Sequence, residues 1–136
     1  MTVDQKLYDA AVELAVARYP TGWSGAAAMY TTDNRILTSV YVETPNSGGE
    51  LCMETGCICE AHKLDIPITA SICVSREAKN EPFIILSPCG ICQERLAFWG
   101  GDVHVAVPQS GDSTKWQSKP LRDVQPYYWR KAFEPF

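Results

Sequence analysis

The chain has 136 residues, which predicts one domain with its own hydrophobic core over residues 1–136. Its net charge of −4 argues against a surface for nucleic acid polymers or anionic membranes, where clustered Lys and Arg are expected. No apolar stretch approaches the ~20 residues that cross a bilayer, and the first residues lack a signal-peptide pattern, so we expect a cytoplasmic protein. In that compartment the six cysteines predict metal ligands or buried thiols rather than disulfides.

In chain order, the first predicted element is an amphipathic helix over residues 4–18, with Leu7, Ala11 and Leu14 on one stripe. The later elements are strands at 26–31 and 35–42 joined by a tight turn, a loop at 44–49, a helix at 50–64, strands at 67–74 and 83–86, a helix from about Cys89 to Gly100, a strand at 103–107, an edge strand at 115–118 and a terminal helix at 121–133 broken at Pro126. This alternation favours a three-layer α/β/α sandwich around a mixed sheet over a helix bundle or a barrel.

The stretch from Ser87 to Glu94 reads Ser-Pro-Cys-Gly-Ile-Cys-Gln-Glu and carries a candidate metal site. If a helix begins near Cys89, the sulfurs of Cys89 and Cys92 lie on one face of its first turn, where the helix dipole favours thiolates. Thiolates are the form of cysteine that binds Zn²⁺. Cys52, which follows a Gly-rich loop at the start of the helix expected at 50–64, is the natural third ligand.

Three thiolates and a water molecule make the open tetrahedral arrangement of a catalytic zinc site. Glu54 is the neighbouring carboxylate expected to accept and deliver protons there. The alternative is a closed structural site with Cys57 or Cys59 as the fourth ligand. Seven residues of helix place Cys59 about 10 Å from Cys52, and Cys57 points to another side. We therefore expect the open site, with Cys57, Cys59 and Cys73 as small buried residues.

The motif Cys-Met-Glu at 52–54, followed by Pro-Cys-Gly-Ile-Cys at 88–92, resembles the Cys-Ala-Glu … Pro-Cys-x-x-Cys signature of the cytidine deaminase superfamily. The resemblance covers nearly the whole chain and implies that family's sandwich with a central mixed five-stranded sheet. It implies one Zn²⁺ per chain, held by Cys52, Cys89 and Cys92, and Glu54 as the proton shuttle of hydrolytic deamination at C4 of a cytosine ring. It also implies a cytosine nucleoside such as cytidine or deoxycytidine as substrate, a role in pyrimidine salvage, and a homotetramer whose neighbours complete each pocket.

Two segments concern the substrate. Nucleoside deaminases of this family carry Asn-x-Glu on the second strand, and the matching residues are Tyr41, Val42 and Glu43. The resemblance implies a sugar contact for Glu43, and Tyr41 stands in place of the Asn. The alternative for Glu43 is a solvated carboxylate, and the alternative for Tyr41 is a packing residue. The segment 127–129, Tyr-Tyr-Trp, is similar to the Tyr-x-Trp segment of blasticidin S deaminase, which implies an aromatic wall that includes Trp129 at the pocket. Core or subunit interface is the equally weighted alternative for these aromatics.

Thr55 and Gln93 stand where nucleoside deaminases of this family carry arginines. A zinc ion with three thiolates keeps a negative charge, so a nearby donor should offset it, and Arg95 and His62 are the candidates. Two other functions stay open. One is deamination of a cytosine-nucleoside antibiotic such as blasticidin S, and the other is a non-catalytic module that zinc stabilises on the same fold.

Overall fold

A mixed six-stranded sheet forms the centre of the molecule, which a computed structural model describes for residues 2–136. Its strands are β1 (Ser24–Thr31), β2 (Ile36–Ser39), β3 (Ile68–Arg76), β4 (Ile84–Ile85), β5 (His104–Gln109) and β6 (Asp112–Pro120). The main path runs β2-β1-β3-β5-β6, and only the β3–β5 pair among these residues is parallel. The short β4 pairs with the end of β3, so the sheet has six strands where five were expected.

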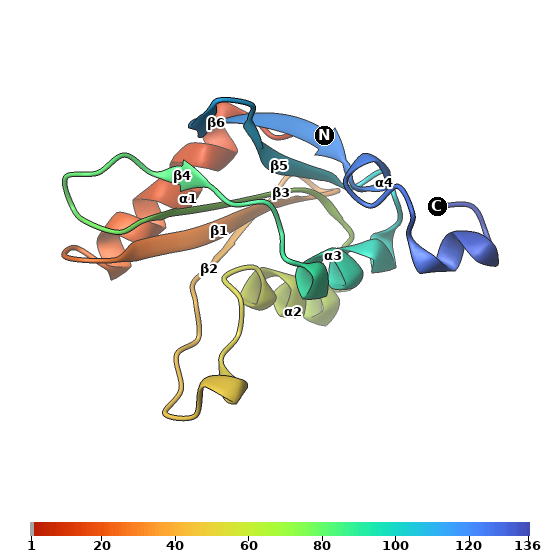
Figure 1. Cartoon of the computed structure of the whole chain (residues 1–136). Coiled ribbons are helices and arrows are strands. Elements are labelled where there is room, and N and C mark those ends of the chain that lie inside the picture. Colours follow the sequence, from red (N-terminus) through yellow and green to blue (C-terminus); the bar gives the residue numbers. More distant parts are fainter. Residues whose placement is uncertain (1) are drawn as a thin grey trace.

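Helices cover both faces of this sheet (Figure 1). They are α1 (Gln5–Arg18), α2 (Thr55–Leu64), α3 (Gly90–Leu96) and α4 (Leu121–Val124), with 3₁₀ turns at Ser47–Gly49, Ala97–Trp99 and Trp129–Ala132. The helix α1 packs on one face, and α2 and α3 lie side by side on the other. The predicted three-layer α/β/α fold is confirmed. None of the helices within residues 2–136 has the length and apolar character needed to span a membrane.

The helix α1 begins where the sequence predicts. The backbone N–H of Leu7 donates to the carboxylate of Asp4, which caps the helix, at 3.0 Å. The hydroxyl of Tyr30 donates to the same carboxylate at 2.9 Å and so fastens the helix start to β1. Leu7, Ala11 and Ala15 are fully buried, because this stripe lies against the sheet.

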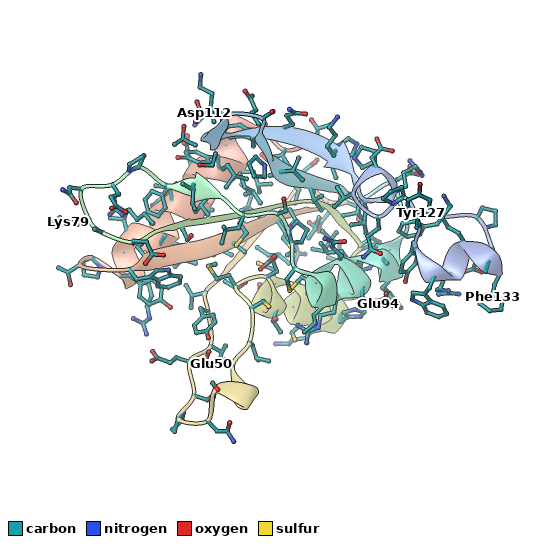
Figure 2. The ribbon with its side chains drawn as sticks, viewed as in Figure 1. Glu50, Lys79, Glu94, Asp112, Tyr127 and Phe133 are labelled. Atoms are coloured by element: carbon teal, nitrogen blue, oxygen red, sulfur yellow. The ribbon has the colours of Figure 1, made fainter. Side chains whose placement is uncertain are left out.

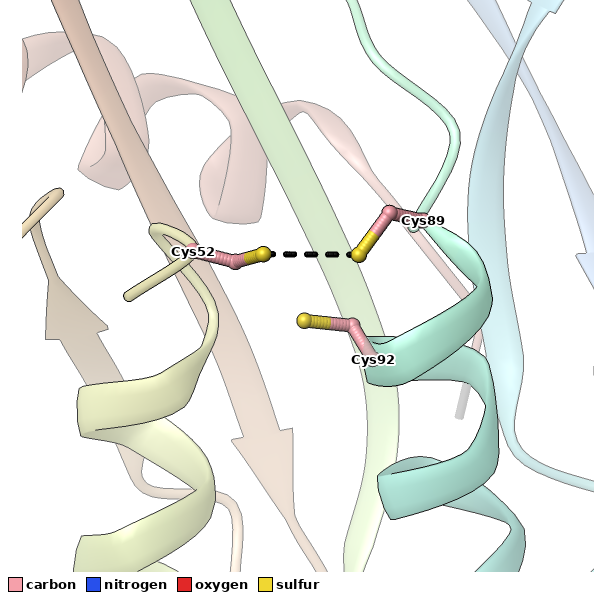
Figure 3. Close-up of side chains that lie close together, drawn as sticks. All are labelled: Cys52, Cys89 and Cys92. Atoms are coloured by element: carbon pink, nitrogen blue, oxygen red, sulfur yellow. Dashed lines mark hydrogen bonds between the residues drawn. The ribbon is translucent and has the colours of Figure 1, made fainter. Parts of the chain in front are cut away.

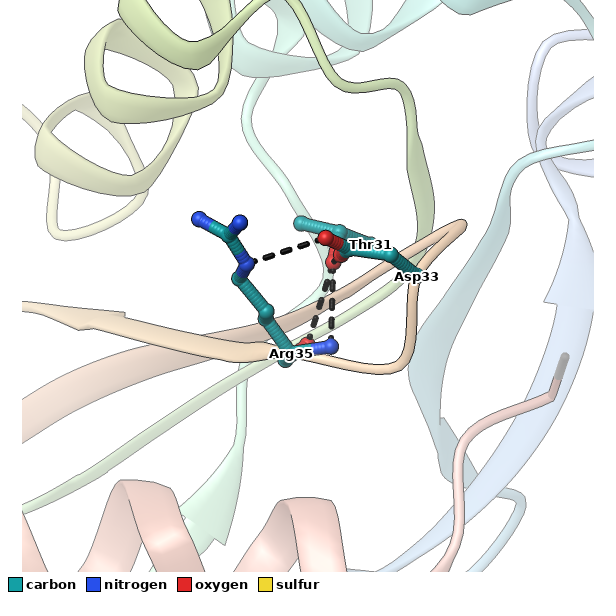
Figure 4. Close-up of polar contacts among 3 residues, drawn as sticks. All are labelled: Thr31, Asp33 and Arg35. Carbon is teal, nitrogen blue, oxygen red and sulfur yellow. Dashed lines mark hydrogen bonds and ion pairs between the residues drawn. The ribbon is translucent and has the colours of Figure 1, made fainter.

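The predicted tight turn joins β1 to β2 (Figure 4). Asn34 adopts the left-handed conformation, with φ of 65°. The hydroxyl of Thr31 donates to the carboxylate of Asp33 and accepts from the backbone N–H of Arg35, and the Arg35 side chain pairs with Asp33 at 2.9 Å. These contacts close the hairpin and fix which residues of β2 face the core.

The second helix starts later than predicted, at Thr55 rather than residue 50. Val42 and Leu51 form an isolated antiparallel bridge, with both backbone hydrogen bonds at 3.1 Å, which keeps the chain extended at residue 51. Cys52 therefore lies in the turn before α2 and not in its first helical turn. For the same reason β2 ends at Ser39 rather than residue 42, since the chain there leaves the sheet to form this bridge.

The C-terminal helix predicted for residues 121–133 breaks at Pro126 as expected, but its predicted extent is wrong. The helix α4 ends at Val124, and a separate 3₁₀ turn begins at Trp129. Pro126 cannot continue a helix, and the side chains that follow it bind elsewhere: the Tyr128 hydroxyl donates to Glu94 of α3 at 3.1 Å. These contacts with α3 replace the expected helix.

Close contact between α2 and β2 depends on Gly56. A Cβ atom at this position would lie 2.6 Å from the Cβ of Ser39. The Ser39 hydroxyl donates to the backbone carbonyl of Met53 and accepts from the backbone N–H of Cys57 at 3.0 Å. The absence of a side chain at residue 56 thus allows one hydroxyl to hold both the start of α2 and the turn before it.

We expect Gly56→Ala to lower the free energy of unfolding by about 1–3 kcal/mol, because the added methyl overpacks this contact. Urea denaturation measures the change. Gly90→Ala is the matched control, since it also adds a methyl to a helical glycine but no atom lies within 4 Å of its Cβ. Equal stability of the Gly56→Ala protein and the wild type would contradict the role given to Gly56.

Candidate functional site

Three cysteine sulfurs converge between α2 and α3 (Figure 3). The Sγ atoms of Cys52, Cys89 and Cys92 all lie within 4.8 Å of one another, and those of Cys52 and Cys89 are 3.3 Å apart. Cys52 comes from the turn before α2, Cys89 caps the start of α3, and Cys92 lies in its first turn. The structure thus brings together the three cysteines that the sequence predicts as ligands.

The first turn of α3 places two of these sulfurs on one face. Cys89 is extended, with φ of −65° and ψ of 167°, and its carbonyl accepts from the backbone N–H of Gln93 at 2.8 Å. The side-chain amide of Gln93 donates to the carbonyl of Pro88 at 2.7 Å, which fixes the entry of the chain into the helix. Gln93 therefore stabilises the turn. As a neutral residue, it supplies no positive charge to offset the thiolates.

The three thiols differ in acidity. Partial burial acts to raise the pKa of Cys89, but hydrogen bonds from the backbone N–H of Cys92, the thiols of Cys52 and Cys92, and the backbone N–H of Ile91 together outweigh it and lower that pKa. Burial raises the pKa of Cys52 and of Cys92, and the charge of Glu54 adds to the effect on Cys92. Cys89 is thus the readiest thiolate, and the other two thiols release their protons on binding a cation.

The cluster fits a zinc ion. Zn–S bonds of about 2.3 Å in a tetrahedron separate the sulfurs by about 3.8 Å, close to the spacing found here. Thiolates select zinc and other soft metals over magnesium or calcium. Within residues 2–136 no fourth His, Cys, Asp or Glu joins the group, so the arrangement is that of an open site.

The other cysteines lie apart from this cluster. Cys57 is fully buried, and its sulfur lies 3.1 Å from the hydroxyl oxygen of Ser39. Cys73 is buried in β3, with its sulfur 3.9 Å from that of Met53. Both were expected to be buried, and they are. Cys59 was also expected to be buried, which is wrong: it is exposed, because it lies on the outer side of α2.

Glu54 is a buried carboxyl beside the cysteine cluster. It precedes the first residue of α2, and its exposed fraction is 4%. Burial raises its pKa, and this effect is partly opposed by hydrogen bonds from the backbone N–H of Glu54 and the Cys73 thiol and, least of all, by the charge of Arg95. A raised pKa makes a carboxyl a better proton donor, which suits general acid–base catalysis.

An aromatic pocket adjoins the cysteine cluster. Its cavity of about 470 Å³ is lined by Tyr19, Trp23, Tyr41 and Glu43. Trp23 and Tyr41 also pack against a small buried cluster of Ala27, Met53 and Cys73. Because Met53 lies between Cys52 and Glu54 in the chain, this packing links the pocket to the cysteine motif.

Sequence reasoning placed Tyr41 and Glu43 at such a pocket but missed Tyr19. The Tyr19 ring stands edge-on to Trp23, with 5.2 Å between ring centroids. Its hydroxyl donates to the backbone carbonyl of Tyr41 at 3.5 Å. No local signal marks this role, because Tyr19 caps the end of α1 and reaches the pocket only through the tertiary fold.

The structure does not bring Trp129 together with Tyr41 and Glu43. Its indole N–H donates to the carboxylate of Glu94 on α3 at 3.2 Å, and its side chain is 60% exposed. The C-terminal segment, of which Figure 2 labels Tyr127 and Phe133, lies beside α3 at the end of the molecule. In one chain, Trp129 therefore belongs to this segment and not to the aromatic pocket.

No protein-family model and no curated protein matches the chain. Among solved structures, the cytidine deaminase from Bacillus anthracis matches it with a TM-score of 0.89 and 45% sequence identity, over 95% of this chain and 91% of that chain. The chain belongs to the cytidine deaminase family. The resemblance carried by the cysteine motifs is thereby confirmed.

Cytidine deaminases of lower sequence identity share the fold of this chain. The enzyme from Burkholderia pseudomallei matches with a TM-score of 0.70 and 21% identity, over 93% of this chain and 99% of that chain. The enzyme from Mycobacterium tuberculosis matches with a TM-score of 0.67 and 22% identity, over 90% of this chain and 96% of that chain. The same sandwich is therefore kept at low sequence identity.

Proposed function

We propose that the protein is a hydrolase that converts a cytosine nucleoside, cytidine or deoxycytidine, to the uracil nucleoside and ammonia. One Zn²⁺ per chain is held by Cys52, Cys89 and Cys92, and Glu54 is the catalytic acid and base. The observation that carries the proposal is a buried carboxyl beside an open three-cysteine cluster. The 45% identity to the cytidine deaminase from Bacillus anthracis supports the reaction.

When bound, zinc supplies the Lewis acidity that makes a water molecule a nucleophile near neutral pH. Glu54 takes one proton from that water and passes it to N3 of the cytosine ring. As the C4–N bond breaks, Glu54 takes the second proton from the hydroxyl that has added to C4 and delivers it to the departing amine, which leaves the C4 carbonyl of the uracil ring. Burial suits Glu54 to these transfers because it brings the pKa of the carboxyl closer to neutrality. The enclosed position of Glu54, 4% exposed, also keeps bulk water away from the proton path.

The aromatic pocket binds the rest of the nucleoside in this proposal. Trp23 and Tyr41 offer ring faces and edges to the base, with 6.1 Å between their centroids. Glu43 is exposed at the same cavity and accepts a hydrogen bond from a sugar hydroxyl. Glu43 lies next to Val42, whose bridge to Leu51 holds this strand beside the start of the cysteine motif.

We expect Glu43→Gln to raise KM for cytidine by about 10-fold with little change in kcat, since a charge-assisted hydrogen bond to the sugar is weakened in ground and transition states alike. Steady-state kinetics with cytidine measure the split. Glu81→Gln, which removes an exposed carboxylate in the loop between β3 and β4, is the control and should behave as the wild type. An unchanged KM in Glu43→Gln would remove Glu43 from the sugar site.

A substrate panel tests the function. Purified, zinc-loaded protein is given cytidine, deoxycytidine, cytosine and blasticidin S, and ammonia release is followed. We expect turnover of the two nucleosides. Turnover of blasticidin S alone would favour the antibiotic deaminase. A folded, zinc-bound protein inactive on all four would be the non-catalytic module.

We further propose one domain over residues 1–136 that acts in cytoplasmic pyrimidine salvage as a homotetramer. Strands from both halves of the chain share one sheet, which supports a single domain. Large apolar side chains lie exposed on α3 and the segments that follow it, as a subunit interface would require. They are Ile91 (60%), Phe98 (70%), Tyr127 (96%), Trp129 (60%) and Phe133 (80%). Light scattering on the purified protein measures the assembly.

A further inference from the structure

The proposed metal centre carries more negative charge than its ion can neutralise. Three thiolates around a divalent ion leave one excess negative charge, and Glu54 adds a second when it is ionised. Cys92 and Glu54 are both buried, at 0% and 4% exposure. Buried charge without a partner is costly, so a cation close to the cluster should stabilise the thiolates.

His62 does not supply this cation. It is exposed on α2, seven residues after Thr55, which corresponds to about 10 Å of helix. Its ring packs against Phe98 and Trp99, with centroid distances of 4.7 and 4.8 Å. The imidazole thus belongs to an aromatic cluster at the far end of α2.

Arg95 does supply this cation. Its guanidinium reaches from α3 to α2, where Nη1 donates to the Thr55 hydroxyl at 2.8 Å. Thr55 is buried and directly follows Glu54. Arg95 stands three residues after Cys92, and Thr55 three residues after Cys52, so the hydrogen bond joins the two segments that supply the sulfurs.

The charge of Arg95 is available to the cluster. Within residues 2–136, no carboxylate oxygen lies within 4.0 Å of its guanidinium nitrogens, whereas Arg35, Arg122 and Arg130 each pair with an acid. The side chain is half-buried, so water screens its charge only in part.

We propose that Arg95 is a positioning residue that balances the negative charge of the three-cysteine metal centre from the neighbouring helix, held in place by Thr55. The inference rests on the zinc site of the proposed function. Arg95 touches neither substrate nor ion. Its positive charge stabilises the negatively charged metal centre, and so the affinity for zinc, and its hydrogen bond to Thr55 ties α3 to the start of α2.

The test measures Zn²⁺ affinity by competition with a chromophoric chelator. We expect Arg95→Gln to bind zinc about 10-fold or more weakly than the wild type, because the positive charge next to the metal centre and the hydrogen bond to Thr55 are both lost. Arg95→Lys keeps the charge and should recover most of the affinity. Arg130→Gln is the matched control: it lines the same surface cavity as Arg95 but pairs with Glu134, and should bind zinc as the wild type does.

Circular dichroism of each zinc-loaded variant checks that the fold is intact. Wild-type zinc affinity in Arg95→Gln would overturn the proposal, as would an equal loss in Arg130→Gln, which would indicate an effect of net charge alone. Arg95→Lys as weak as Arg95→Gln would overturn the electrostatic role. Chelator competition measures zinc affinity without any turnover. If the protein is inactive on every aminopyrimidine but Arg95→Gln still binds zinc more weakly, the role of Arg95 at the metal centre is supported and only the proposed deaminase function is ruled out.

Discussion

Glu54→Gln is expected to lower the turnover of cytidine by about 10²–10⁴-fold, the usual loss when a general acid–base group is removed. The amide has the shape of the carboxyl but cannot carry a proton from water to the ring or to the departing amine. Because Glu54 is buried beside the cysteine cluster, an isosteric replacement keeps the packing that a shorter residue would disturb. Ammonia release in saturating cytidine measures the effect.

Metal analysis should show that Glu54→Gln still holds about one zinc per chain, since the carboxyl is not among the three clustered ligands. Glu60→Gln serves as the control, because it removes an exposed carboxylate from the same helix. Full activity of Glu54→Gln would rule out Glu54 as the proton shuttle. Loss of zinc from it would instead make Glu54 a ligand.

Cys92→Ala should abolish stoichiometric zinc binding and, with it, all deamination. The Cys92 sulfur is fully buried and faces those of Cys52 and Cys89, and two thiolates do not complete a zinc site. We expect zinc content to fall from about one per chain to a small fraction after dialysis. The melting temperature should also fall, because bound metal stabilises the folded state.

Two controls separate ligation from the general effect of losing a thiol. Cys57→Ala removes an equally buried cysteine from α2, and Cys59→Ala removes an exposed one; these are the two alternative fourth ligands. Both proteins should keep their zinc. Zinc loss from either would show a closed four-cysteine site and would argue against catalysis.

The sequence was most informative where structure is local. The spacing of Cys89 and Cys92 sets them on one face of a helical turn, and the structure confirms it. The stripe of Leu7 and Ala11 likewise predicted α1, because burial of one helix face follows directly from periodicity. That Cys52 would join the other two depended on ligand count and on the family motif.

Features set by contacts between distant residues could not be predicted. The delayed start of α2 results from the bridge between Val42 and Leu51. Pro126 predicted a break near the C-terminus, but not the hydrogen bonds from Tyr128 and Trp129 to Glu94. The sequence offered Arg95 and His62 as partners of the cluster, although such a histidine is more often a surface residue of a helix. The direction of the side chains, set by the packing of α3 on α2, decides between them.

The bridge between Val42 and Leu51 also bears on how this part of the chain can change. The chain leaves the fold after Val42 and returns at Leu51, and two backbone hydrogen bonds hold these residues together. Residues 44–50, beyond the proposed sugar contact Glu43, project from the body of the molecule (Figure 1). Doubling the length of a flexible loop costs only about 0.6 kcal/mol in closure entropy. The segment can therefore accept an inserted peptide or epitope without moving Cys52, and its length can vary during evolution independently of the metal centre.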